Sequence, residues 1–392
     1  MQRDKIDNQS NGDKLVTVAI HTHEKAQVLK SILESEGIKA VLHGINLIEP
    51  SIAGSVRVRI KESDLQSALR VIEQVDFTSN NKQDLDDEYA LGDKNKKPQS
   101  SNEVLIPVDF SDYTLLTCEF GFKLAHDLNC SVKLMHIFFT PFYPAAIPFS
   151  DAFAMPATDK DIYQDIRDKT EKDMKALHQK IEDRIVDGTL PNVPYTTTLI
   201  EGLPEEEIIS YSKKYKPEAI VMGTRGKNAQ ESNLIGSVTA EVMDGCRTPI
   251  FAVPEDSKVR NISELKRIVF LTNFQEREFD AFDIMMKFLK PYPVKLYLAH
   301  LAKKEDVWNE IKLSGLQKYF TETYPHLQAE YRLIDQSESL EESIEDFIKK
   351  NNVDMISLSS SRRGIFARMF NPGIARRMIF HSDTPMLVIK GM

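Results

Sequence analysis

Hydrophobic positions in the first eighty residues switch between strand and helix spacing. Val16, Val18 and Ile20 alternate with polar residues as in a half-buried strand, and apolar residues then recur at helical spacing from 26 to 33. Two more alternating runs, 38–42 and 56–60, precede a second helical stripe over 65–72. The order β-α-β-β-α is typical of a small ferredoxin-like α+β sandwich. We therefore expect a domain over residues 13–78.

Residues 79–102 break this pattern. Only four of these residues are apolar, and the rest are charged or polar: Leu85, Tyr89, Ala90 and Leu91 are the exceptions. Such a segment solvates itself and cannot bury a core, so we interpret 79–102 as a charged linker. The small cluster around Tyr89 either docks on a neighbouring surface or is part of the tether.

From residue 103 onwards, apolar runs of strand length alternate with longer amphipathic stretches. The expected strands are 104–108, 132–138, 195–200, 219–223 and 249–253, and the expected helices are 113–128, 162–185, 204–214 and one after Ser237. Continuously apolar strands alternating with helices predict a parallel sheet covered on both faces. The fold class predicted for 103–255 is thus a doubly wound α/β domain.

Residues 265–392 repeat this pattern with local identities. Val132-Lys-Leu recurs as Val294-Lys-Leu, and Thr248-Pro249 recurs as Thr384-Pro385. The offset between the copies falls from 164 residues at Phe110 and Phe274 to 136 at Thr248 and Thr384. We interpret this as a tandem duplication, in which the second copy has lost residues between its second strand and its final helices. The chain then has three domains.

Composition limits the partners and the cellular compartment that we expect for the protein. The 392 residues carry a formal net charge of -9, so no general attraction to nucleic acid is expected. The three cysteines are scattered and lack metal-binding spacing, which favours buried thiols in a reducing compartment. The sequence has no apolar run of about 20 residues and no signal-peptide core near Met1. We therefore expect a cytoplasmic protein that does not enter a membrane.

The strongest chemical signal lies between 219 and 239. An apolar run ends at Gly223, Gly226 follows in a polar loop, and Gly236-Ser237 opens an expected helix. Glycines allow a ligand to approach the backbone, and a helix N-terminus offers unpaired N–H groups to an anion. The sequence has neither a P-loop nor the G-x-G-x-x-G dinucleotide motif. No lysine or acidic partner is arranged for phosphoryl transfer, so binding without catalytic residues is predicted.

The spacing G-x2-G-x9-G-S-V-T resembles the nucleotide-binding signature of the universal stress protein family. The resemblance extends over 103–255 and includes Val-Leu-Ile-Pro-Val-Asp109-Phe-Ser and Lys133-Leu-Met-His-Ile137. It implies a five-stranded doubly wound domain with ATP at the carboxyl ends of the strands, where ligands of such sheets generally bind. The segment before the linker, with its Asp64–Ala68 stretch, is similar to a short bacterial signal-transducing domain.

The resemblance also implies roles for individual residues. Asp109 would face the ribose or a phosphate-bound ion such as Mg²⁺, which it would hold only indirectly. The other residues implied are Pro107 and Val108 beside Asp109, Ile137 near the adenine, Met222 and Gly223 at the base and ribose, and Arg225, Gly226, Gly236, Ser237, Val238 and Thr239 around the phosphates. Each has a simpler interpretation: Asp109 can cap a helix, Ile137 can be core, and Arg225 can be a solvated charge.

The second copy departs from the signature. Aligned on Thr384-Pro385, the replacements are Ser359 for Gly223, Arg362 for Gly226, Pro372 for Gly236 and Gly373 for Ser237. Aligned on Phe110 and Phe274, Asn273 replaces Asp109. A side chain at the second glycine position would fill the space of the phosphates, so the second copy is not expected to bind ATP. The arginines 362, 363, 368, 376 and 377 either attract another anion or form a solvated or interface cluster.

Two further features remain open at this point. The aromatic, proline-rich segment 138–157 is a lid over the adenine, a partner surface, or a loop folded on its own domain. The second copy lacks most of it. Among the histidines, His21 and His23 suggest polar surface, whereas His136 and His300 occupy equivalent strands and are expected to be buried and hydrogen-bonded.

These features lead to three functional hypotheses. The leading one is a cytoplasmic ATP-binding sensor in the stress response, whose N-terminal domain passes a signal to a protein partner. The second is a protein-interaction adaptor that binds no nucleotide, and the third is a slow ATPase, for which no base or arginine finger is evident. The expected partners are an adenine nucleotide and an unidentified protein. Pairing of the two copies within the chain is expected, and a homo-oligomer is left open.

Overall fold

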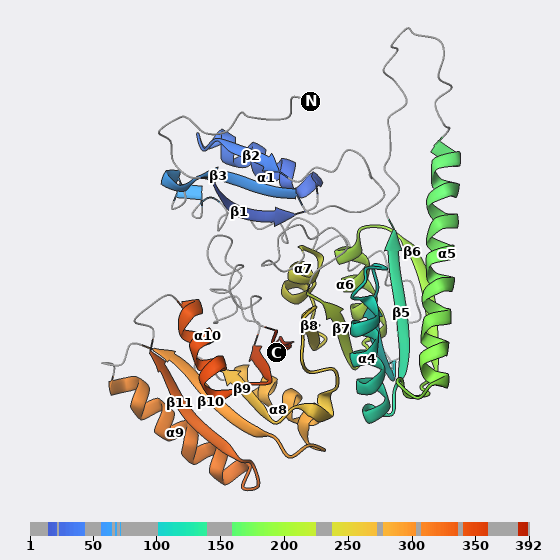
Figure 1. Cartoon of the computed structure of the whole chain (residues 1–392). Coiled ribbons are helices and arrows are strands. Elements are labelled where there is room, and N and C mark those ends of the chain that lie inside the picture. Colours follow the sequence, from blue (N-terminus) through green and yellow to red (C-terminus); the bar gives the residue numbers. More distant parts are fainter. Residues whose placement is uncertain are drawn as a thin grey trace, which may run out of the picture. The chain divides into compact units, whose positions relative to one another are not determined.

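The structure of the chain is a computed structural model (Figure 1). It describes residues 15–21, 23–43, 56–64, 67–68, 71, 101–138, 159–224, 237–272, 277–302, 307–335, 340–359 and 383–390. The chain divides into two compact units, one formed by Met1–Leu47 with Gly54–Lys94 and the other by Ile48–Ala53 with Asn95–Met392.

The first unit contains a three-stranded antiparallel sheet packed on a helix. Its elements are β1 (Leu15–His21), α1 (His23–Ser35), β2 (Ala40–His43), β3 (Val56–Lys61) and a short 3-10 turn, η1 (Glu62–Asp64). The strand order is β1-β3-β2. Leu29 and Leu33 of α1 pack with Val58 and Ile60 of β3, and all four are fully buried. The predicted β-α-β-β order is confirmed, whereas most of the second helical stripe lies outside the described residues, so the ferredoxin-like assignment stays a prediction.

The second unit is built on one sheet of ten strands. The first repeat supplies β4 (Glu103–Pro107), β5 (Ser131–Phe138), β6 (Tyr195–Glu201), β7 (Ala219–Gly223) and β8 (Ile250–Val253), and the second supplies β9 (Arg267–Leu271), β10 (Lys295–Ala302), β11 (Ala329–Asp335), β12 (Met355–Ser359) and β13 (Met386–Ile389). The sheet order is β11-β10-β9-β12-β13-β8-β7-β4-β5-β6. Each repeat therefore has the same internal order and only parallel pairs.

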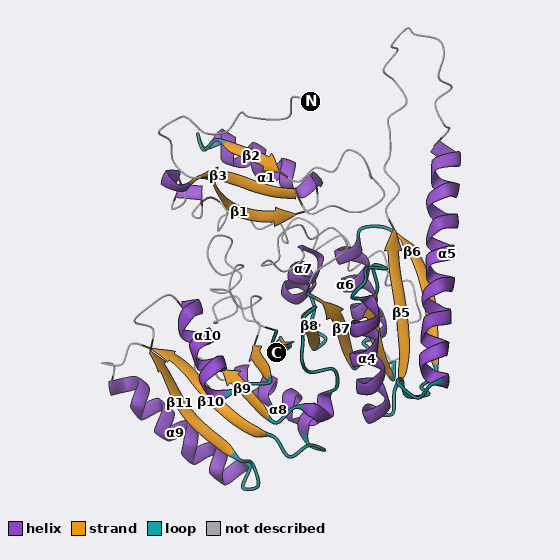
Figure 2. Ribbon diagram, viewed as in Figure 1, coloured by secondary structure: helices purple, strands orange, loops and turns teal. Residues whose placement is uncertain are grey.

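Helices cover both faces of this sheet, as the continuously apolar strands predict (Figure 2). One face packs against α4 (Thr114–Leu128), α5 (Asp159–Val186), α8 (Arg277–Leu289) and α9 (Val307–Thr323). The other packs against α6 (Pro204–Tyr215), α7 (Ser237–Gly245) and α10 (Leu340–Asn351). The helix α4 lies so close to β4 that a Cβ added at Gly121 would lie 2.3 Å from Cδ1 of Ile106. These layers form the doubly wound α/β fold, arranged as two tandem repeats.

The last strands of the two repeats join the sheet into one. The strand β8 pairs with β13 in antiparallel fashion, with Phe251 opposite Leu387. Ile250 pairs with Val388 and Ala252 pairs with Met386. Ile250 and Met386 occupy equivalent positions in the two repeats, as do Ala252 and Val388, so the two pairs are related by a local twofold axis. The junction is therefore symmetric about the Phe251–Leu387 pair. Phe251 also contacts the ring of Phe288 in α8 edge-on, with 5.3 Å between the centroids.

Most of the length difference between the repeats lies in one crossover. Residues 139–194 separate β5 from β6, whereas only residues 303–328 separate β10 from β11. The last two strands of each repeat are equally spaced, by residues 224–249 in the first and 360–385 in the second. The predicted loss thus falls between the second and third strands.

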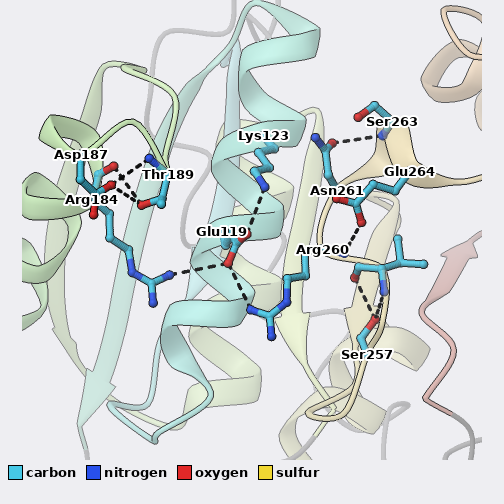
Figure 3. A network of polar contacts seen from close by, with 11 residues as sticks. Glu119, Lys123, Arg184, Asp187, Thr189, Ser257, Arg260, Asn261, Ser263 and Glu264 are labelled. Atoms are coloured by element: carbon cyan, nitrogen blue, oxygen red, sulfur yellow. Dashed lines mark hydrogen bonds and ion pairs between the residues drawn. The ribbon is translucent and has the colours of Figure 1, made fainter.

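A network of polar contacts holds the segment that connects the repeats (Figure 3). One carboxylate oxygen of Glu119, in α4, lies 3.6 Å from Nη1 of Arg184 in α5 and 3.4 Å from Nη1 of Arg260 in the connecting segment. The other oxygen lies 3.0 Å from Nζ of Lys123. Downstream of Arg260, a 3-10 turn, η2 (Ile262–Glu264), buries Ile262 fully in the core. The connecting segment is therefore fastened to the helices of the first repeat.

Two sequence expectations concern the described residues as a whole. All three cysteines are buried and unpaired by disulfides, as predicted. Within the ranges that the structure describes, no helix combines the length and the apolar character that crossing a bilayer requires.

Candidate functional site

The strand order of the first repeat places a switch point beside β4. β5 pairs with β4 on one side and β7 pairs with it on the other, so the crossovers diverge to opposite faces there. Ligands of doubly wound sheets bind outside the carboxyl ends of the strands at such a point. Asp109 follows the end of β4 and Gly223 ends β7. The two residues that the sequence singled out most strongly therefore sit on adjacent strands at the expected edge.

Asp109 closes the loop between β4 and α4. Its Oδ1 accepts hydrogen bonds from the backbone N–H of Ser111, at 3.0 Å, and from Oγ1 of Thr114, at 3.1 Å. The helix-capping interpretation of Asp109 is wrong, because the N-cap residue of α4 is Tyr113 and no side chain caps the helix. Asp109 instead holds the loop before the helix through the Ser111 N–H and the Thr114 hydroxyl. Sequence reasoning missed Thr114, for which the spacing D-x-S-x-x-T was the available signal.

Phe110, the next residue, adopts a backbone conformation that is unusual for a bulky side chain. Its φ is 57°, in the left-handed region. Its ring packs on the imidazole of His136, with 4.2 Å between the centroids. Nδ1 of His136 lies 2.7 Å from the carbonyl oxygen of Val108, so that nitrogen carries the proton and donates it. Strained residues of this kind persist where the surroundings fix them, and they are concentrated at functional sites.

The end of β7 is tied to the first turn of α7. Oγ1 of Thr239 donates a hydrogen bond of 2.8 Å to the carbonyl oxygen of Gly223. Because α7 begins at Ser237, this bond holds the helix N-terminus at the carboxyl edge of the sheet. The first N–H groups of a helix lack intrahelical partners and attract anions. Thr239, predicted as a phosphate ligand, therefore uses its hydroxyl proton to position the helix.

Apolar residues line one side of this edge. Ile137 and Met222 are buried, at the ends of β5 and β7, and Val238 of α7 packs against the same core cluster. Val108 belongs to the core on the opposite face of the sheet. The residues predicted near the base are therefore brought together, while Val108 is separated from them. Arg225, Gly226 and Gly236 lie outside the described residues.

The corresponding edge of the second repeat is built differently. Thr272 stands where the first repeat has Val108, and its Oγ1 donates a hydrogen bond of 2.6 Å to Oε2 of Glu278, with both residues buried. Ser359 replaces Gly223 and is also buried. Nδ1 of His300 lies 2.6 Å from the carbonyl oxygen of Thr272, which matches the contact of His136. Both repeats therefore have a histidine that donates a hydrogen bond to the backbone carbonyl just after the first strand, which we call the histidine clamp. The glycine at the end of β7 has no counterpart in the second repeat.

The chemistry of this edge is that of a binding site. It combines a helix N-terminus, one carboxylate and an apolar wall. Among the residues that the structure describes, no group of three or more His, Cys, Asp or Glu side chains could hold a metal ion.

Comparisons with known proteins agree with this geometry. The model of the universal stress protein family matches residues 101–254. A universal stress protein of Methanocaldococcus jannaschii is 25% identical over 157 residues, which are 40% of this chain and 84% of the relative. One from Bacillus subtilis is 23% identical over 153 residues, 39% of this chain and 98% of the relative.

The solved structures extend the likeness of fold beyond the first repeat. The structure of a universal stress protein from Archaeoglobus fulgidus aligns with a TM-score of 0.53 at 17% sequence identity, covering 74% of this chain and 97% of that one. This share is larger than a single repeat, so the fold likeness includes part of the second. The match to the universal stress protein family thus covers residues 101–254, and the likeness of fold extends further along the chain.

Proposed function

We propose that the first repeat binds ATP at the carboxyl edge of β4 and β7, and that the protein acts as a nucleotide-dependent regulator without catalysing a reaction. The observation that carries this proposal is the bond between Thr239 and Gly223, because it fixes a helix N-terminus at the switch point of the sheet. Anionic phosphates are the ligand class that such an edge attracts most directly.

The described side chains suggest which part of the site would contact each part of the nucleotide. The N–H groups at the start of α7 would face the phosphates, and the apolar surface of Ile137 and Met222 would face the adenine. Asp109 would accept a hydrogen bond from a ribose hydroxyl, next to the loop that its Oδ1 holds. Mg²⁺, if it accompanies ATP, would neutralise phosphate charge and would be held mainly by phosphate oxygens.

Binding is proposed for one repeat only. A bare glycine backbone lets a ligand approach the strand end, and Gly223 provides this in the first repeat. The buried Ser359 takes its place in the second repeat, and Arg362 takes the place of Gly226 in the sequence alignment. One nucleotide per chain follows. We further propose that the N-terminal unit passes the bound or free state of the first repeat to a protein partner.

Nucleotide extraction tests this proposal most simply. The purified full-length chain is heat-denatured, and the supernatant is analysed for adenine nucleotides by chromatography and mass spectrometry. Wild-type protein should release ATP or ADP, whereas Gly226→Val should release at least tenfold less, because the new side chain would fill the phosphate space (about 1.4 kcal/mol per tenfold). Protein that releases nothing, and that also fails to take up added ATP, would favour the adaptor hypothesis instead.

A further inference from the structure

The helix α9 is apolar on two sides. Its inner side buries Leu316 and Phe320 against the sheet. Its outer side leaves Trp308 69% exposed, Ile311 54% and Tyr319 45%. Trp308 is the sole tryptophan of the chain. Large apolar side chains exposed together on a soluble protein mark interaction surfaces more often than scattered ones do.

These exposed residues form a continuous line along the helix. Trp308, Ile311, Gly315 and Tyr319 are separated by three, four and four positions, which places them on one side of an α-helix. We call these four residues the α9 stripe. A Cβ added at Gly315 would meet no atom within 4 Å, so the middle of the stripe is open backbone. Another helix could approach closely at this point.

The fold of the repeat does not require the α9 stripe. The corresponding crossover helix of the first repeat is α5, which lies between β5 and β6 as α9 lies between β10 and β11 (Figure 1). The exposed positions of α5 are largely charged, for example Lys169, Lys172 and Lys175. Both helices bury one apolar side against the sheet, but only α9 adds a second. Tyr319 also contacts Phe279 of α8, but packing within the repeat does not account for the exposure of Trp308 and Ile311.

We propose that the α9 stripe is the interface between two copies of this chain, whose α9 helices pack antiparallel about a twofold axis at Gly315. Ile311 precedes Gly315 by four positions and Tyr319 follows it by four, so each Ile311 would meet the partner's Tyr319. Trp308 and Glu322 lie seven positions to either side, so each Trp308 ring would lie beside the partner's Glu322. Every contact occurs twice, as a closed twofold interface requires.

The available area indicates a weak but specific dimer. With side chains of about 150–250 Å² for the aromatic residues, the exposed fractions correspond to roughly 500 Å² of apolar surface on each copy when Val307 is included. Two copies would then bury about 1,000 Å², which is at the lower limit for a specific interface. We therefore expect association in the micromolar range that depends on protein concentration.

The position of Gly315 allows a variant that separates folding from association. Gly315→Arg should strengthen the helix, because glycine is the poorer helix former and the new Cβ meets no neighbour. The same side chain would block close approach of a second helix. Gln317→Arg adds an equal charge to an exposed position of α9 outside the stripe and serves as the matched control.

Sedimentation equilibrium between about 1 and 200 µM, a range that spans micromolar dissociation constants, is combined with the fluorescence of Trp308. The wild-type chain and Gln317→Arg should dimerise, and their tryptophan emission should move to shorter wavelength as concentration rises. Gly315→Arg should dimerise at least about tenfold more weakly and keep a solvent-like emission throughout. A wild-type chain that stays monomeric with solvent-exposed Trp308, as expected if the stripe binds another protein, would overturn the proposal. Equal dimerisation of Gly315→Arg would overturn it as well.

Discussion

At the scale of single residues, the candidate site shows which assignments a sequence can support. Asp109 and Gly223 were placed at the correct strand ends, because apolar runs end visibly at them. The hydrogen bonds of Asp109 with Ser111 and Thr114 could not be ranked against a ligand role, since both roles need the same carboxylate. The left-handed φ of Phe110 could not be predicted, because a bulky residue rarely adopts it and its ring contacts a residue from another strand.

Burial of the cysteines makes a prediction about their reactivity. Desolvation raises the pKa of Cys118 to about 12, that of Cys130 to about 11 and that of Cys246 to about 11. Since the thiolate is the reactive form and all three pKa values lie well above 8, the thiols should stay protonated and react slowly with a disulfide reagent at pH 8 in the native state. Chain unfolded in guanidinium should react rapidly at three thiols. Rapid native reaction of any one would contradict its described burial.

Glu119 allows a test of the network in Figure 3. Glu119→Gln removes the charge that faces Arg184, Arg260 and Lys123, and the side chain of Glu119 is only 13% exposed. We expect the free energy of unfolding to fall by about 1–3 kcal/mol, as for a charged hydrogen-bonding group left without its partner. Glu171→Gln, in an exposed pair with Arg167, should cost less than about 1 kcal/mol. Equal effects in urea titrations would mean that the network adds nothing beyond a surface pair.

At the scale of elements, periodicity predicted most of the second unit. The strands expected at 104–108 and 219–223 appear as β4 and β7, and the long stripe at 162–185 appears as α5. The symmetric register between β8 and β13 could not be predicted, because apolar composition identifies a strand that needs a partner without fixing its alignment. The exposed apolar side of α9 could not be predicted either. A search for helical periodicity looks for one apolar side per helix, and α9 has two.

The junction of the two repeats should be sensitive to a single core deletion. Phe251 is fully buried and contacts Phe120 of the first repeat and Phe288 of the second. Phe251→Ala should lower the free energy of unfolding by about 3–5 kcal/mol, through lost burial and a cavity between the repeats. Val186→Ala, at a position that is 86% exposed, should change it by less than about 0.5 kcal/mol. A small effect at Phe251 would show that the junction repacks easily.

At the scale of the whole molecule, the two repeats share one strand order and differ at the carboxyl ends of their strands. Both have the strand order of the doubly wound fold and the histidine clamp at the end of their first strand. The bare glycine of the first repeat has become the buried Ser359 in the second, where Thr272 and Glu278 form a polar contact of their own. Substitutions at a strand end disturb packing less than substitutions within the sheet, so a ligand edge can be lost while the fold stays.

The aromatic segment 138–157 falls outside the described residues apart from Phe138, and its predicted role can be tested by hydrogen exchange. If the segment closes over the adenine, its apolar side chains leave water at about 25 cal/mol per Å², which a ligand could use to offset the entropy of ordering. Amide exchange across 138–157 should then slow when ATP is added to wild-type chain. In Gly226→Val it should not change. Equal exchange with and without ATP in the wild type would leave a packing or partner role.

We propose that one ATP binds per chain, at the edge formed by Asp109, Gly223 and the start of α7. Isothermal titration calorimetry of the full chain should give a stoichiometry of about one, with binding abolished in Gly226→Val, because a side chain there would fill the phosphate space. Arg362→Val, at the equivalent position of the second repeat, should bind as the wild type does. Two equivalent sites, or unchanged affinity in Gly226→Val, would contradict the account.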